Sequence, residues 1–287
     1  MAGFCVAGQG GGCASAYHAG VIKALEKRFG LDSLKGVRGS SGLIINWSYV
    51  ISRQTDIIIP IWEFLFRSKK FITPLRHPTG RGVMDIDFLV DRVVYQGKFA
   101  LDLDAFHDNP AQMDIGVTNA KTGQSRFFKK DSSASFYKLL HATCMVPYFG
   151  SSGPVEIYDQ MYYDGTIGSV LGLERIQNEQ NILLILTRPY RPIAHMCAAR
   201  TLLRWALLRH ESPELQKAIW SMPMRYNKTL ENMHKIMRRK NVAVICPEEK
   251  LPVWRIDTRL ARLRKTIAQG YEDTMHHKGL ERFFARL

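Results

Sequence analysis

The chain has 287 residues, enough for one large domain or two smaller ones, and 46% of them are apolar and 23% charged. Its cysteines, Cys5, Cys13, Cys144, Cys197 and Cys246, form no Cys-x-x-Cys pair, which argues against a zinc site and a disulfide framework. The net charge of +14 indicates attraction to an anionic surface, either nucleic acid or acidic lipid head groups.

The sequence also predicts where in the cell the protein is found. No apolar run approaches the roughly 20 residues that a membrane-spanning helix needs. The first residues lack the basic region of a signal peptide. With the unpaired cysteines, these features predict a cytoplasmic protein in a reducing compartment, whose basic surface makes peripheral contact with anionic membranes.

The first fifty residues alternate short apolar runs with helical patterns. Residues 4–7 read as a buried strand, residues 10–12 are three glycines, and residues 16–27 carry apolar side chains at helical spacing. A second strand and turn end at residues 39–42, before the apolar helical run 43–47. This order predicts parallel strands joined by helices.

The remaining elements are predicted from the same periodicities. The expected strands are 113–119 and 125–128 (a hairpin), 155–163, 182–186 and 242–246. The expected helices are 85–95, 132–140, 171–177, much of 190–240, and one or two within 259–287. Residues 57–66 suit a buried helix or a flap over a site. The fold class expected is α/β with a mainly parallel sheet.

The two early turns carry the chemistry. Glycines between a strand and a helix let backbone N–H groups approach an anion, and the helix N-terminus adds partial positive charge. Ser41 lies on the second strand-to-helix turn, where a hydroxyl is exposed and suited to act as a nucleophile. An anion cradle beside a poised serine indicates acyl transfer.

Three motifs in order resemble those of patatin-like phospholipases. They are Gly10-Gly11-Gly12 followed by Ala19-Gly20-Val21, then Gly39-Ser40-Ser41, then Tyr163-Asp164-Gly165. Residues 142–147 are similar to the stretch that precedes the family's aspartate. The resemblance covers about residues 3–190, and the remainder is similar only in general layout to bacterial cytoplasmic members. It implies a three-layer α/β/α fold, with residues 1–190 as catalytic core and 191–287 as a basic helical part packed on the same domain.

The resemblance implies a Ser–Asp dyad in place of a triad. Ser41 would attack an ester carbonyl of a phospholipid or related lipid, and Asp164 would move the proton. The backbone N–H groups of Gly11, Gly12 and Cys13 would hold the oxyanion. Such a dyad requires neither a metal ion nor an organic cofactor.

Two positions depart from the family pattern. The basic residue expected two positions after the third glycine is replaced by Ala14, and the last glycine of Gly-x-Ser-x-Gly is replaced by Leu43. The second change puts a side chain where strand and helix crowd together, although Gly42 offers part of the missing space. These departures motivate an alternative function: a catalytically weak or inactive patatin-like protein that binds lipid or anionic membranes.

Each candidate residue also has a simpler interpretation. Ser41 could only cap the following helix, Ser40 could be the nucleophile if the turn slips by one residue, and Asp164 could be a turn residue before glycine. His18 and His141 lie nearest the motifs, but a structural role is favoured for both over membership of a triad.

Two further function classes fit less well. A dinucleotide-binding turn would need a third glycine at the position of Cys13 and leaves Ser41 and Asp164 without a role. Nucleic-acid binding depends on charge alone, because no zinc-finger spacing or RNA-binding motif is present. No nucleic-acid partner is therefore expected.

Overall fold

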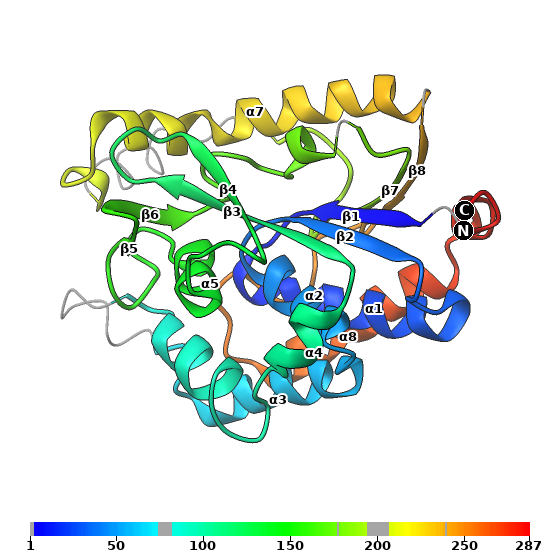
Figure 1. Cartoon of the computed structure of the whole chain (residues 1–287), viewed down its shortest axis with the longest axis horizontal. Coiled ribbons are helices and arrows are strands. Elements are labelled where there is room, and N and C mark those ends of the chain that lie inside the picture. Colours follow the sequence, from blue (N-terminus) through cyan, green and yellow to red (C-terminus); the bar gives the residue numbers. More distant parts are fainter. Residues whose placement is uncertain (1–2, 74–81, 177, 194–206, 239) are drawn as a thin grey trace.

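The computed structural model describes residues 3–73, 82–176, 178–193, 207–238 and 240–287. These residues form one eight-stranded sheet in the order β5-β6-β3-β2-β1-β7-β8, with β4 paired to β3 (Figure 1). The strands are β1 (Phe4–Gly8), β2 (Leu34–Gly39), β3 (Gln112–Asn119), β4 (Ser125–Lys129), β5 (Val155–Ile157), β6 (Gln160–Asp164), β7 (Asn181–Ile185) and β8 (Asn241–Ile245).

The sheet is mainly parallel. Strands β3, β2, β1, β7 and β8 run in one direction, whereas β4, β5 and β6 are joined to this core by antiparallel pairing. The α/β fold class is therefore confirmed. Because the carboxyl ends of parallel strands meet at one edge, the turns that follow β1 and β2 lie side by side.

Helices cover both faces of the sheet. The long helix α7 (Pro213–Met237) lies along one face, and most other helices lie on the opposite face (Figure 1). The latter are α1 (Ala16–Phe29), α2 (Gly42–Ile51), α3 (Ile58–Ser68), α4 (Leu103–Asp108), α5 (Phe136–Cys144) and α8 (Leu260–Met275). Helix α9 (Lys278–Phe284) contacts β8, and its Phe283 and Phe284 rings pack against Phe4 of β1. The arrangement has three layers, as expected.

The side chains of β7 alternate between two buried cores, which explains why nearly the whole strand is apolar. In β7, Leu183 and Ile185 join the large core on the α1 and α2 side, whereas Ile182 and Leu184 join the smaller core that includes Tyr226 of α7. All four strand residues are at most 1% exposed. Both faces of the strand are buried at these four positions, which explains why all four are apolar.

Several element boundaries differ from the expected ones. The helix expected at 132–140 begins at Phe136 and continues to Cys144, because the serines before it form turns. The helix expected at 85–95 has a π-helical segment, η4 (Phe88–Val94), and the helix expected at 171–177 is reduced to the 3-10 turn η5 (Leu173–Arg175). Residues 194–206, part of the expected helical stretch 190–240, lie outside the described residues.

The C-terminal part is built onto the N-terminal part. Strand β8 extends the sheet beside β7, and α8 crosses α1 at two glycines: a Cβ on Gly20 would lie 1.9 Å from the carbonyl oxygen of Ile267, and one on Gly270 would lie 2.2 Å from that of Tyr17. The division at residue 190 stays a prediction. Among the described helices, none combines the length and apolarity needed to cross a membrane.

Candidate active site

The glycine turn after β1 packs directly on the serine turn after β2. A Cβ on Gly10 would lie 2.6 Å from Cβ and 3.1 Å from Oγ of Ser41. A Cβ on Gly42 would lie 2.4 Å from Oγ of Ser15, at the end of the 3-10 turn η1 (Gly12–Ser15). Only hydrogen fits at either position, so these glycines bring the two turns into contact.

Ser41 has a strained backbone on the turn between β2 and α2. Its φ is 61° and its ψ is −145°, a conformation that side-chain-bearing residues rarely adopt. The Ser41 N–H donates to Oγ1 of Thr143 at 2.9 Å, and that hydroxyl donates to the carbonyl of Gly116 at 2.7 Å. Thr143 at the end of α5 thus fixes the turn to the neighbouring strand β3.

Asp164 at the end of β6 is brought to Ser41. The Ser41 side chain lies beside the Asp164 carboxylate and acts on its pKa. The carboxylate accepts from the N–H of Thr166 at 2.8 Å and from its hydroxyl at 2.7 Å. The next residue, Gly165, makes the approach possible, since a Cβ there would lie 2.3 Å from the carbonyl oxygen of Gly116 and 2.8 Å from Cβ of Ser40.

Burial tunes the Asp164 carboxyl. Asp164 is only 1% exposed, and the loss of solvation raises the pKa of its carboxyl above the ordinary value. The hydrogen bonds from Thr166, the neighbouring Ser41 side chain and the charge of Arg255 oppose this rise. A carboxylate with a raised pKa is a stronger base than an exposed one. The shift is therefore in the direction that proton abstraction from a serine requires.

Cys144 completes the surroundings of the Ser41 hydroxyl. It lies beside the Ser41 side chain, and burial raises the pKa of its thiol well above the usual value, so the thiol stays protonated. Sequence reasoning assigned no role to Thr143, Cys144, Thr166 or Arg255. Thr143 and Cys144 lie within residues 142–147, and the resemblance of this stretch to the family's is the sequence signal that could have found them.

The N–H groups of the glycine turn differ in whether they donate to a backbone oxygen. Gly11 and Gly12 have φ values of +146° and +60°, which favour glycine. Across the described ranges their N–H groups donate to no backbone oxygen. The Cys13 N–H, in contrast, donates to the carbonyl oxygen of Arg255 at 3.0 Å. Of the three expected oxyanion donors, this one is already engaged in the conformation described here.

The two departures from the family pattern have different consequences. Leu43 is fully buried, and its methyl groups occupy space left by glycines on both strands: a Cβ on Gly8 would lie 2.9 Å from its Cδ1, and one on Gly39 would lie 3.0 Å from its Cδ2. The space for Leu43 thus comes from Gly8 and Gly39, while Gly42 accommodates Ser15. Ala14 leaves the turn without its own cation, and the positive charge of Arg255 acts on Asp164.

The two histidines near the motifs have structural partners. His18 is fully buried on α1, with Nε2 2.8 Å from the carbonyl oxygen of Gln9, and burial lowers its pKa to about 4. A neutral ring therefore donates to the glycine turn. The side chain of Ser40 is also buried, and its Cβ faces Gly165.

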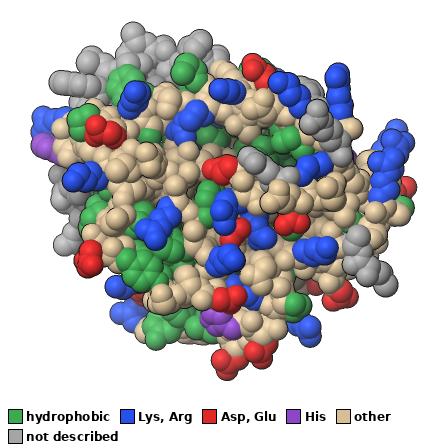
Figure 2. Space-filling model, turned by 45° about the horizontal axis from the view of Figure 1, so that its top comes forward, with side chains coloured by type: hydrophobic (Ala, Val, Ile, Leu, Met, Phe, Trp, Pro, Cys, Tyr) green, Lys and Arg blue, Asp and Glu red, His purple; other side chains and the backbone are tan. Residues whose placement is uncertain are grey.

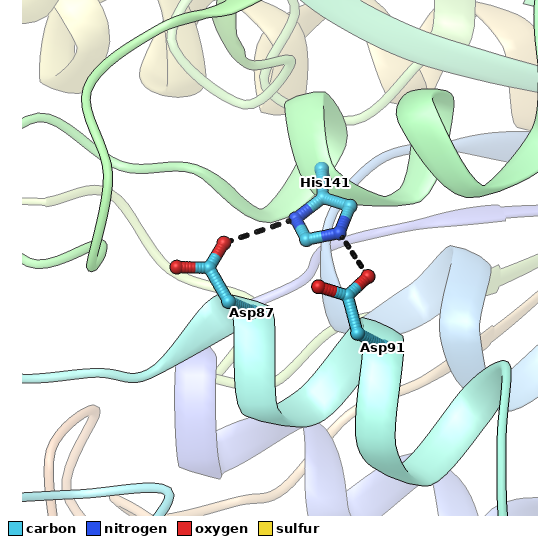
Figure 3. Close-up of side chains that lie close together, drawn as sticks. All are labelled: Asp87, Asp91 and His141. Atoms are coloured by element: carbon cyan, nitrogen blue, oxygen red, sulfur yellow. Dashed lines mark hydrogen bonds and ion pairs between the residues drawn. The ribbon is translucent and has the colours of Figure 1, made fainter.

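His141 on α5 lies between two carboxylates (Figure 3). Its Nε2 is 2.8 Å from Oδ1 of Asp91, and its Nδ1 is 3.4 Å from Oδ1 of Asp87. In the described part of the chain, these residues are the cluster of acids and histidines close enough to hold a metal ion. The two ring nitrogens face different carboxylates, however, and Asp87 also accepts from the hydroxyl of Ser151 at 2.9 Å. The geometry is that of a histidine bridging two acids.

Comparison with known proteins gives limited matches. Residues 212–282 match a family model described as a domain of unknown function, DUF6363. No curated protein matches the sequence. Among solved structures, the chain is similar to VipD from Legionella pneumophila, with 12% sequence identity and a TM-score of 0.47. That alignment covers 99% of this chain but 66% of VipD, so the chain spans a little less than two thirds of that protein.

Proposed function

We propose that the chain is a serine acyl hydrolase of the patatin-like type, which cleaves carboxylic ester bonds of phospholipids or related lipids. The observation that carries the proposal is the position of the Ser41 side chain, on its strained turn, beside the buried Asp164. The raised pKa of Asp164 supports its role as the base. The order of the three motifs supports the lipid-ester substrate class.

The reaction follows from the placement of these groups. Ser41 Oγ attacks the ester carbonyl while its proton passes to Asp164, and the Gly11 and Gly12 N–H groups stabilise the oxyanion. Collapse of the tetrahedral species expels the alcohol, which takes the proton from Asp164. Water then attacks the acyl-enzyme, with Asp164 again accepting and returning the proton. This sequence requires no metal ion or cofactor.

The proposal is tested by hydrolysis of a short-chain aryl ester. Ser41→Ala and Asp164→Asn should each lower kcat/KM by about a thousandfold or more, because the two residues act as one unit. Ser40→Ala is the matched control, since it keeps the Cβ that faces Gly165, and it should retain wild-type activity. An inactive wild type, or full activity in both dyad variants, would exclude the proposed dyad.

The alternative is a lipid-binding protein without catalysis. Two observations favour it: Cys13 N–H is engaged, and Ser41 and Asp164 are only 6% and 1% exposed. On the face that carries α7, Lys and Arg side chains are dispersed with acidic side chains between them (Figure 2). Contact with anionic membranes and a cytoplasmic location remain expectations. A wild type that binds anionic vesicles but hydrolyses no ester would support the alternative.

A further inference from the structure

A short segment near the C-terminus lies on the glycine turn. We call residues 253–257 the clasp. Its Arg255 carbonyl oxygen accepts the Cys13 N–H at 3.0 Å, and a Cβ on Gly12 would lie only 2.5 Å from the same oxygen. The Cys13 thiol donates to the carbonyl of Asp257 at 3.7 Å. A backbone carbonyl of the clasp therefore occupies the acceptor position that the resemblance assigns to a substrate oxygen.

The clasp has no regular secondary structure, and hydrogen bonds within it and to the start of α8 hold it in place. The Asp257 carboxylate accepts from the Trp254 N–H at 3.4 Å, the Arg259 N–H at 3.0 Å and Nη1 of Arg262 at 3.2 Å. The Val253 N–H donates to Oγ1 of Thr266 on α8 at 3.2 Å. Because the clasp is not part of a helix or a strand, its release breaks no element of secondary structure.

The outer side of the clasp suits a lipid surface. Trp254 is 69% exposed, and with Ile72 and Ile256 it lines a hollow of about 330 Å³. Arg255 and Arg259 are exposed on the same stretch. A large exposed tryptophan beside cations is the combination that enters the head-group region of an anionic bilayer. The inner side of the clasp is polar backbone bound to the turn.

We propose that the clasp is an autoinhibitory contact that an anionic phospholipid surface opens. With the clasp in place, its carbonyl holds Cys13 N–H and keeps it from the oxyanion. When Trp254 enters the lipid surface, the Arg255 carbonyl leaves and Cys13 N–H joins Gly11 and Gly12 at the oxyanion. This inference rests on the proposed function, because the Cys13 N–H is assigned to the oxyanion that forms in the proposed ester hydrolysis.

The test measures the rate at which a fluorophosphonate labels Ser41, followed by intact mass. In this reaction Ser41 Oγ bonds to phosphorus, fluoride leaves, and the serine proton passes to Asp164. Asp257→Asn and Thr266→Val each loosen the clasp and should label about tenfold faster than wild type without lipid, since one oxyanion donor is worth that much or more. Asp104→Asn, an exposed acid on α4, is the matched control and should label at the wild-type rate.

The lipid arm uses vesicles of equal parts phosphatidylcholine and phosphatidylglycerol. These vesicles should accelerate labelling of wild type about tenfold and leave Trp254→Ala at its slow rate. Met224→Ala removes another exposed apolar side chain, on α7, and should respond as wild type does. Thermal unfolding of every variant checks that it is folded.

The outcomes separate the two proposals. Absence of label on Ser41 in every protein, with and without vesicles, contradicts the proposed function itself. Labelling of wild type at the rate of both loosened variants overturns the clasp. Equal acceleration of wild type and Trp254→Ala by vesicles overturns the lipid surface as the opening partner.

Discussion

At Gly10, only a hydrogen atom fits between the glycine turn and Ser41. Since a Cβ there would lie 3.1 Å from Ser41 Oγ and 2.6 Å from its Cβ, Gly10→Ala must push the Ser41 side chain or the turn aside. A displacement of about 1 Å near the reacting atoms lowers the rate about a hundredfold. We expect that loss in kcat for aryl ester hydrolysis.

The control for this prediction is Gly153→Ala, where a Cβ would meet open space. It carries a positive φ and therefore tests the cost of backbone strain without contact at the site. Wild-type kcat in Gly10→Ala would mean that the turn is not packed against Ser41 as described.

His18 makes folding stability depend on pH. Its pKa is lowered by burial to about 4 from 6.5, so the unfolded chain binds more protons than the folded chain between these values. The stability is complete above about pH 6.5 and is lost as the pH falls towards 4, by about 3 kcal/mol at the lower end.

Urea unfolding of wild type and His18→Gln across this pH range measures the effect. Glutamine retains an N–H donor towards Gln9 but does not titrate, so its stability should fall less steeply with acid. Parallel pH profiles for the two proteins would show that His18 is not buried as a neutral ring.

Helices α1 and α8 are joined by a reciprocal glycine contact. Gly20 fits against the backbone of α8 and Gly270 fits against the backbone of α1, so neither position has room for a methyl group. Gly20→Ala should therefore destabilise the fold by about 1–3 kcal/mol, despite the better helix propensity of alanine.

The free energy of unfolding in urea tests this contact. Lys23→Ala, on the exposed side of α1, provides the comparison and should change stability by less than about 0.5 kcal/mol. If Gly20→Ala were as stable as the lysine variant, the two helices would not meet at this distance.

The charge of the whole molecule predicts salt-dependent binding to lipid. With a net charge of +14, the protein should bind phosphatidylglycerol vesicles at low ionic strength, and affinity should fall about tenfold or more between about 0.05 M and 0.5 M salt. Vesicle sedimentation measures this fall, with pure phosphatidylcholine vesicles as the uncharged control. Binding that is equal on both kinds of vesicle would exclude electrostatic recruitment.

Much of the fold was predictable because its signals are local. The parallel strands β1, β7 and β8 appear as short apolar runs, and the β3–β4 hairpin appears as alternation around a turn. The shift of α5 was not predictable from periodicity, because serines before Phe136 can begin a helix or form turns equally well.

The sequence by itself determined the α/β class and identified Ser41 and Asp164 as the candidate dyad, because strand periodicity and the short motifs are properties of neighbouring residues. Only the tertiary structure decided how Leu43 fits, through the space left by Gly8 and Gly39. It also decided that Arg255 binds Cys13, a contact between residues far apart in the chain. Such contacts depend on how α8 and the sheet pack together, which no local pattern encodes.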